Sequence, residues 1–185
     1  MKSALLIGSA LLVSALPSAA SAEPVLLISI DGLQPADILK SEERGIQVPN
    51  LKQFITNGTY ADKVKGVLPT VTYPSHATLL TGVSPAKHGI VGNNSFDPMQ
   101  INQGGWYWYA SDFKAPTLWD AAAKAGLSTA NIHWPVSVQA KAVTWNIPQI
   151  WRTRHSDDAK LLKALATPGL IEALETDLGS YAPGI

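Results

Sequence analysis

One short segment near the N-terminus constrains the fold more than any other part of the sequence. Val25–Ile30 is apolar except for Ser29, and it stands between Pro24 and the turn-forming pair Asp31-Gly32. A short, almost continuous apolar run between turn residues is typical of a strand buried on both faces, as in a parallel sheet. The segment therefore predicts an α/β fold.

The rest of the chain alternates predicted strands and helices. Strands are expected at 59–67 and 127–132. Proline, glycine and acidic residues mark the boundaries of predicted helices at 49–55, 75–81, 117–125, 159–165 and 169–178. Residues 89–105 are rich in Gly, Asn, Asp and Pro and predict a loop. This alternation favours an α/β sandwich with a mostly parallel sheet.

The first 22 residues have the three parts of a secretory signal peptide. Lys2 gives a positive start, Ala4–Leu16 is apolar, and Ala20-Ser21-Ala22 is a small-residue cleavage site. The apolar run is shorter than the ~20 residues that span a membrane, which favours cleavage over anchoring. We therefore predict a signal peptide at 1–22, a periplasmic or secreted mature protein, and no stable membrane span after cleavage.

Charge and cysteine content exclude some partners and stabilising features. Lys plus Arg and Asp plus Glu each number 14, so the formal net charge is zero. The sequence has no basic stripe of the kind that binds a nucleic-acid backbone, so a nucleic-acid duplex is not expected as a partner. Because the chain has no cysteine, it has no disulfides. The sequence does not indicate an oligomeric state.

Asp31 is the first candidate metal ligand. It follows the predicted strand Val25–Ile30 directly, and Gly32 then turns the chain. In open α/β sheets, ligands bind outside the carboxyl ends of the strands. Without other information, a helix or turn cap is the better interpretation of Asp31, because most Asp-Gly pairs are of that kind.

Thr72 is the candidate nucleophile. It lies just before the helix expected to start near Pro74 or Ser75. Free N–H groups and a partial positive charge at a helix N-terminus attract phosphate. A threonine hydroxyl is a weak nucleophile and needs a base or a metal ion to activate it. The alternative is that Thr72 only caps the helix.

Several motifs in order carry a family resemblance. They are Ile28-Ser29-Ile30-Asp31-Gly32-Leu33, Pro69-Thr70-Val71-Thr72-Tyr73-Pro74-Ser75-His76, and Thr81-Gly82-x-x-Pro85-x-x-His88-Gly89-Ile90, followed by Asn93 and Asp97-Pro98. Together they resemble the type I phosphodiesterase/nucleotide pyrophosphatase family of the alkaline phosphatase superfamily, over roughly residues 24–140. The resemblance includes residues 115–119 and the Trp134-Pro135 pair.

The resemblance implies a three-layer α/β/α sandwich of the alkaline phosphatase type with two divalent metal ions, usually zinc. Asp31 matches an aspartate ligand, and Thr72 matches a nucleophile that also contacts a metal ion. Asn93 matches an asparagine that donates to a nonbridging phosphate oxygen. Tyr73 matches an aromatic on which a nucleobase or aryl group stacks. Without the resemblance, Asn93 is an ordinary turn residue and Tyr73 a packing aromatic.

The implied activity is hydrolysis of phosphodiester or pyrophosphate bonds in small, nucleotide-like phosphate esters, through a phosphothreonine at Thr72. Residues 23–185 would then be the N-terminal part of the catalytic domain. The family's further ligands are an aspartate with a nearby histidine, an adjacent Asp-His pair and a late histidine. None of them has a match before Ile185. We therefore expect a fold that is incomplete at its C-terminus, and a truncated fragment that is inactive by itself.

Three alternatives compete with this interpretation. A sulfatase needs Cys or Ser where this chain has Thr72, and so it is disfavoured. A phosphomonoesterase of the alkaline phosphatase type is the closer rival, because threonine occurs there although serine is more common. A non-catalytic binding fragment is the third.

The histidines and the aromatic run have plainer interpretations. His76 and His88 are expected to be structural or to support the site, and His133 to pack in the core. His155, near Asp157 and Asp158, belongs to a capped helix start rather than a metal cluster. Residues 106–109, a run of Trp and Tyr, are expected to pack on the core rather than to form a substrate platform.

Overall fold

The computed structural model describes residues 23–99, 101, 105–150 and 157–180. The predicted signal peptide at 1–22, and His155 beside the predicted helix start, lie outside these residues. The chain divides into two units at Gln47 and Val48, and each is described by itself.

The first unit, over residues 23–47, is simple. Its helix α1 (Pro35–Leu39) starts with a proline, and the Asp37 carboxylate accepts the Gln34 N–H at 3.0 Å. Arg44 pairs with the same carboxylate at 2.7 Å. A turn follows, in which the Ile46 N–H donates to the Ser41 carbonyl at 2.8 Å. Short-range polar contacts of this kind fix the fold of residues 34–46.

The strand expected at Val25–Ile30 is not formed in this structure. The segment belongs to no strand among the described residues, and its apolar side chains are 51–93% exposed. A strand is completed only by hydrogen bonds to a neighbouring strand, and such a neighbour comes from a distant part of the sequence. The prediction of a strand at 59–67 is also wrong, because no strand forms there.

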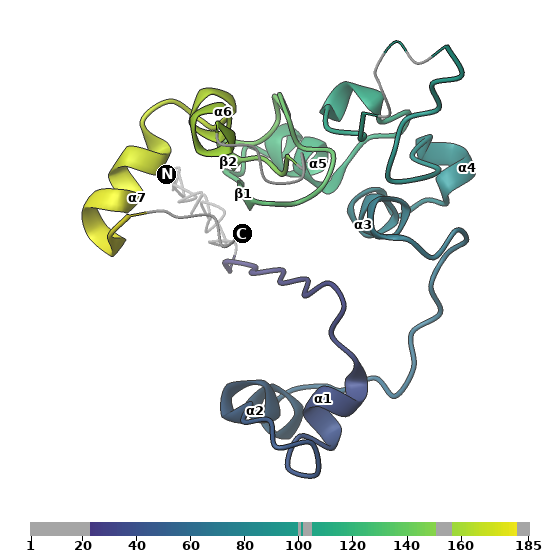
Figure 1. Cartoon of the computed structure of the whole chain (residues 1–185), viewed down its shortest axis with the longest axis vertical. Helices are drawn as coiled ribbons and strands as arrows, with labels where there is room; N and C mark the ends of the chain where they lie inside the picture. Colours follow the sequence, from purple (N-terminus) through teal and green to yellow (C-terminus); the bar gives the residue numbers. More distant parts are fainter. Residues whose placement is uncertain (1–22, 100, 102–104, 151–156, 181–185) are drawn as a thin grey trace, which may run out of the picture. The chain divides into compact units, whose positions relative to one another are not determined.

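The regular secondary structure of the second unit, from Val48 onward, is mostly helical (Figure 1). Its elements in chain order are α2 (Pro49–Asn57), α3 (Thr72–Thr81), α4 (Pro85–His88), η1 (Ala110–Asp112), α5 (Leu118–Lys124), β1 (Ala130–Ile132), β2 (Trp145–Ile147), α6 (Asp158–Leu165) and α7 (Leu170–Leu178). The predicted helices are confirmed with shifted ends. Helix α4 and strand β2 are too short to give a clear periodic pattern in the sequence.

Two strands form the sheet of the described residues. β1 and β2 pair in parallel, with Ala130 opposite Trp145 and Ile132 opposite Ile147. Only the end of the strand expected at 127–132 is therefore formed. Helices together with a small parallel sheet confirm the α/β class. The three-layer sandwich and its incomplete C-terminus stay predictions.

Two core clusters of the second unit are assembled around one face of α3. Tyr73, Ala77 and Leu80 follow the i, i+4, i+7 spacing of an amphipathic helix, and all three are buried. Tyr73 and Ala77 pack with Ile90 and Val136, whereas Leu80 packs with a second cluster that includes Trp119 of α5. These contacts anchor α3 along its length. The site at its first turn is therefore held by a rigid element.

The helix ends of the second unit follow ordinary capping chemistry. α3 ends at Gly82, which has φ +68° and donates its N–H to the Thr78 carbonyl at 2.8 Å. At the start of α5, Thr117 and Asp120 form a capping box: the Thr117 N–H donates to the Asp120 carboxylate at 2.7 Å, and the Asp120 N–H donates to Thr117 Oγ1 at 3.2 Å.

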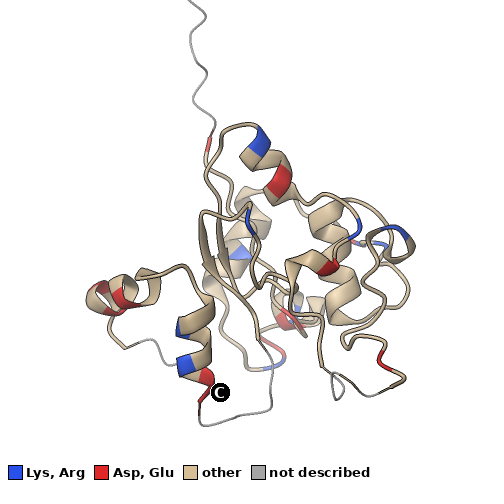
Figure 2. Cartoon of the chain, turned by 90° about the horizontal axis from the view of Figure 1, so that it is seen from above, with Lys and Arg blue, Asp and Glu red and all other residues tan. Residues whose placement is uncertain are grey.

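Charged residues are interspersed in the described part of the chain (Figure 2). Acidic and basic positions both occur along the helices and loops, which agrees with the balanced composition. The helices that the structure describes are too short or too polar to cross a bilayer.

Candidate active site at the start of helix α3

Thr72 is the first residue of α3, so the helix begins earlier than the sequence predicts. The extended residue before it, Val71, occupies the N-cap position, and no side chain caps the helix there. The half-buried Thr72 therefore does not have the N-cap position that the alternative interpretation gave it. Its hydroxyl belongs to the positive end of a ten-residue helix, where negative charge is stabilised.

The first turn of α3 offers fewer free N–H groups than the sequence argument assumed. Pro74 has no N–H, and the Ser75 N–H donates to the Val71 carbonyl at 3.2 Å. The Tyr73 N–H donates to Asn93 Oδ1 at 2.9 Å. Attraction of a phosphate to this turn must therefore come mainly from the helix dipole and from side chains, rather than from a row of free amides.

Asn93 lies beside the peptide bond that follows Thr72, although it is twenty residues further along the chain. Because the Tyr73 N–H is a donor, the Asn93 atom that meets it must be the oxygen. The opposite side of the planar amide, Nδ2, then carries two donor hydrogens. The Asn93 carbonyl accepts the Tyr107 N–H at 3.0 Å, which fixes the backbone of this loop.

His76 contacts the same turn from one helical turn away. Its Nδ1 lies 2.8 Å from the Thr72 carbonyl oxygen. Its ring stands edge-on to Trp134, with ring centroids 5.1 Å apart and planes at 77°. Sequence reasoning gave His76 only a general structural role. The i, i+4 spacing from Thr72 is the signal that points to the contact.

Tyr73 is in the core rather than on a surface open to ligands. The side chain is 1% exposed, and its ring meets Trp106 edge-on at 5.2 Å. Burial raises the pKa of its phenol far above the ordinary value, so the group stays neutral. This environment supports the packing alternative. A stacking role for Tyr73 stays a prediction without support from the structure.

His88 is a buried histidine that holds the loop after α4. Its ring accepts the Ile90 N–H at Nδ1 (3.1 Å), which leaves Nε2 as the protonated nitrogen facing Thr78 Oγ1 at 3.0 Å. Burial lowers its pKa from the ordinary value of 6.5. The side chain is 0% exposed, which confirms the structural interpretation.

The predictions for His133 and for the aromatic run at 106–109 have different outcomes. His133 is exposed, so the expected core position is wrong. Trp106 and Tyr107 pack on the cluster around Tyr73, which confirms the packing interpretation for these two residues, whereas Tyr109 is 44% exposed.

Asp31 belongs to the first unit and lies exposed in the turn before Gly32, which has φ +73°. A short distance between Asp31 and Thr72 is therefore still a prediction. Among the described residues, no group of three or more His, Cys, Asp or Glu side chains is arranged to hold a metal ion. The described residues alone do not fit a complete zinc shell, which takes about four ligands.

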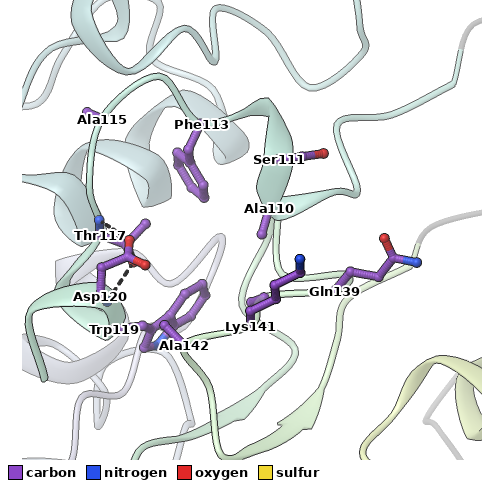
Figure 3. Close-up of a pocket in the computed structure, with 11 residues that line it drawn as sticks. Ala110, Ser111, Phe113, Ala115, Thr117, Trp119, Asp120, Gln139, Lys141 and Ala142 are labelled. Atoms are coloured by element: carbon purple, nitrogen blue, oxygen red, sulfur yellow. Dashed lines mark hydrogen bonds between the residues drawn. The ribbon is translucent and has the colours of Figure 1, made fainter. Parts of the chain in front are cut away.

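A separate pocket of about 260 Å³ lies between η1, the start of α5 and residues 139–142 (Figure 3). Phe113 and Trp119 line it, and Lys141 stands on the other side. The Thr117 N–H and hydroxyl both donate to the Asp120 carboxylate within the capping box. None of the predicted site residues lines this pocket. It is therefore distinct from the start of α3.

Comparison with known proteins decides the family. Residues 25–176 match the sequence profile of the type I phosphodiesterase / nucleotide pyrophosphatase family. The chain belongs to this family. The resemblance inferred from the ordered motifs is thereby confirmed, and the match extends beyond the region that those motifs cover.

Three relatives illustrate the similarity to members of this family. Ectonucleotide pyrophosphatase/phosphodiesterase family member 3 of Rattus norvegicus is 30% identical over 70% of this chain and 15% of its own length. A venom phosphodiesterase of Naja atra is 28% identical over 89% of this chain and 20% of its own length. Bis(5'-adenosyl)-triphosphatase enpp4 of Mus musculus is 36% identical over 57% of this chain and 21% of its own length. The chain thus spans 15–21% of the length of these relatives.

Proposed function

We propose that this chain supplies the nucleophile and the phosphate-contacting amide of an enzyme that hydrolyses phosphodiester or pyrophosphate bonds in small, nucleotide-like esters. Family membership supports the reaction class. The observation that carries the proposal is the bond from the Tyr73 N–H to Asn93 Oδ1 at 2.9 Å. It joins the two motifs whose residues would attack and hold the phosphate.

Thr72 is the proposed nucleophile. Its hydroxyl oxygen loses its proton to solvent and attacks phosphorus, one ester or phosphate group departs with the bonding electrons, and a phosphothreonine that keeps the other substituent results. Water then cleaves the Thr72 Oγ–P bond and restores the hydroxyl. The position of Thr72 at the positive end of α3 supports this role, because the dipole favours the anionic substrate and the developing alkoxide.

Asn93 is the proposed donor to a nonbridging phosphate oxygen. With Oδ1 engaged by Tyr73, its Nδ2 keeps donor hydrogens for a ligand beside Thr72. A donor fixed before the reaction begins stabilises negative charge in the transition state by about 3 kcal/mol. The fixed backbone of Asn93 supports such preorganisation.

Two divalent metal ions, with zinc as the expected element, are part of the proposal. Asp31 and Thr72 are the residues of this chain that would contribute ligands. When bound, the metal ions lower the pKa of the attacking hydroxyl and neutralise phosphate charge. Two oxygen ligands are too few for one complete shell, so other residues of the protein would have to complete it. We therefore also propose that the present 185 residues are inactive alone.

The N-terminal segment and the relatives support export. Because the relatives carry names such as venom phosphodiesterase and ectonucleotide pyrophosphatase, we propose a periplasmic or secreted location for this protein. Cleavage after Ala22 would give a mature N-terminus at Glu23, which N-terminal sequencing of the exported protein would detect.

Substitution of Thr72 tests the function. The complete gene product is assayed with a bis-aryl phosphate and a mono-aryl phosphate. We expect Thr72→Ala to lower kcat by at least about 1,000-fold, because the hydroxyl oxygen that attacks phosphorus is then absent. Retention of the full rate by this variant would eliminate the proposal.

The ratio of the hydrolysis rates for the two esters distinguishes a phosphodiesterase from a phosphomonoesterase. Preference for the diester supports the phosphodiesterase. Preference for the monoester supports a phosphomonoesterase of the alkaline phosphatase type. Absence of turnover of either ester by the unmodified complete protein, with zinc supplied, would favour the non-catalytic alternative.

A further inference from the structure

The peptide bond between Thr72 and Tyr73 is held by side chains on both sides. Its carbonyl oxygen lies 2.8 Å from His76 Nδ1, and its N–H donates to Asn93 Oδ1 at 2.9 Å. A peptide unit is planar and nearly rigid. Holding its oxygen and its hydrogen at the same time therefore fixes the rotation of the whole plane.

The orientation of this plane matters because of where it lies in the chain. Its rotation is set by ψ of Thr72 and φ of Tyr73. Those two angles determine how the Thr72 Cα–Cβ bond stands relative to the rest of α3. A side-chain clamp on the plane therefore limits the directions in which the Thr72 hydroxyl can point.

Hydrogen-bond chemistry assigns the state of the His76 ring. A carbonyl oxygen only accepts, so Nδ1 must carry the proton that it donates to Thr72. The neutral ring then has its proton on Nδ1 and a lone pair on Nε2.

Trp134 fixes the other side of the His76 ring, and the loop around it is rigidly built. The Trp134 N–H donates to Asn131 Oδ1 at 3.1 Å, and its carbonyl accepts the Ser137 hydroxyl. Both partners are buried. Val136 in the same loop has φ +57°, a strained value for a β-branched residue that only strong surrounding contacts maintain.

We propose that His76 is a positioning residue for the nucleophile: with Asn93 it clamps the Thr72–Tyr73 peptide, and Trp134 keeps its ring in place. This inference rests on the proposed role of Thr72. It assigns His76 an action through Thr72 and no contact with substrate. Displacement of a reacting atom by about 1 Å costs about 100-fold in rate, so loss of the clamp is expected to lower kcat far more than it changes KM.

Three variants of the complete gene product separate clamping from packing. His76→Phe keeps an aromatic ring against Trp134 but removes the donor. His76→Asn places an amide N–H near the position of Nδ1 and so restores the donor. Thr81→Val is the matched control, because it removes an i−4 side-chain bond to the Ala77 carbonyl (2.7 Å) at the other end of α3.

We expect His76→Phe to lower kcat by about 10- to 100-fold with KM nearly unchanged. His76→Asn should recover most of that loss, and Thr81→Val should keep the kcat of the unmodified protein. Full activity of His76→Phe, or equal loss in His76→Phe and His76→Asn, would overturn the inference. If Thr72→Ala keeps the full rate, the proposed function fails instead, whatever the His76 variants do.

A second measurement needs no catalysis and no variant. Long-range ¹H–¹⁵N NMR correlations of the 185-residue chain report which ring nitrogen of His76 carries the proton. A proton on Nδ1 is the expected result. Protonation of Nε2 alone would show that the bond to the Thr72 carbonyl is absent, and it would overturn the clamp even if His76→Phe failed to fold.

Discussion

The two regions that the proposed mechanism joins are built in different ways. The first turn of α3 is tied by contacts four and twenty residues away in sequence, and it sits on a buried core. Residues 23–47 carry the short helix α1, a turn and a partly exposed ion pair, and their apolar run is open to solvent. The partners that hold the first turn of α3, from Asn93 to the more distant Val136, all lie in the second unit. A buried strand, in contrast, needs neighbours from distant parts of a sequence.

The largest expected difference comes from one substitution made in both regions. Ile90 is 0% exposed and Ile28 is 62% exposed. In the 185-residue chain, Ile90→Ala should lower the free energy of unfolding by about 2–5 kcal/mol, because it leaves a cavity in a packed core. Ile28→Ala should change it by less than about 0.5 kcal/mol. Urea denaturation followed by tryptophan fluorescence measures both.

The same two substitutions, made in the complete gene product, test whether Val25–Ile30 is buried there. If Val25–Ile30 forms a buried strand there, Ile28→Ala becomes about as destabilising as Ile90→Ala. Equal costs of the two substitutions in the 185-residue chain itself would contradict the exposed placement of Ile28.

A smaller effect is a pH dependence that belongs to the α3 region alone. Burial lowers the pKa of His88 from its ordinary 6.5, so the folded state prefers the neutral ring. The unfolded chain then binds the proton more readily than the folded chain does. His88 should contribute its full share of stability above pH 6.5 and lose it as the pH falls below that value, until the lowered pKa is passed.

Comparison with His88→Gln isolates this contribution. The glutamine keeps a donor for Thr78 and does not titrate, so the difference in unfolding free energy between the two proteins should shrink as the pH falls from 7.5 to 5. This pH interval reaches from about one unit above to about 1.5 units below the ordinary histidine pKa. A difference that grows on acidification would contradict the neutral, buried state of His88.

The smallest expected effect lies in residues 23–47. Arg44 and Asp37 pair at 2.7 Å, with 43% and 22% of their side chains exposed. Arg44→Ala should cost no more than about 1 kcal/mol, and the effect should shrink in high salt because exposed pairs are screened. Chemical denaturation at low and high salt measures it. A large loss that salt leaves unchanged would show that this region is held by more than surface contacts.

The sequence predicted those features that local chemistry determines. The boundaries of α5 follow from Thr117 and Gly126, and the turn after α3 follows from Gly82. Ordered motifs also placed Thr72 and Asn93 in one site, and the bond to Tyr73 supports that grouping.

Features that depend on several residues at once were missed or misplaced. The contact of His76 with Trp134 depends on the packing of a distant loop, which spacing along one helix does not reveal. The strand at Val25–Ile30 was inferred from hydrophobicity alone, and hydrophobicity does not specify a pairing partner. The exposed position of His133, at φ +57°, depends on a turn that no residue preference indicates.

Trapping the covalent intermediate is the most direct test of the central claim. The complete gene product is mixed with a bis-aryl phosphate, quenched in acid within one turnover, digested and analysed by mass spectrometry. The account predicts an aryl phosphoryl group, which keeps one of the two aryl esters, on Thr72 and on no other residue of the peptide that contains it. Rapid product formation with an unmodified Thr72, or with the phosphoryl group on another residue, would contradict it.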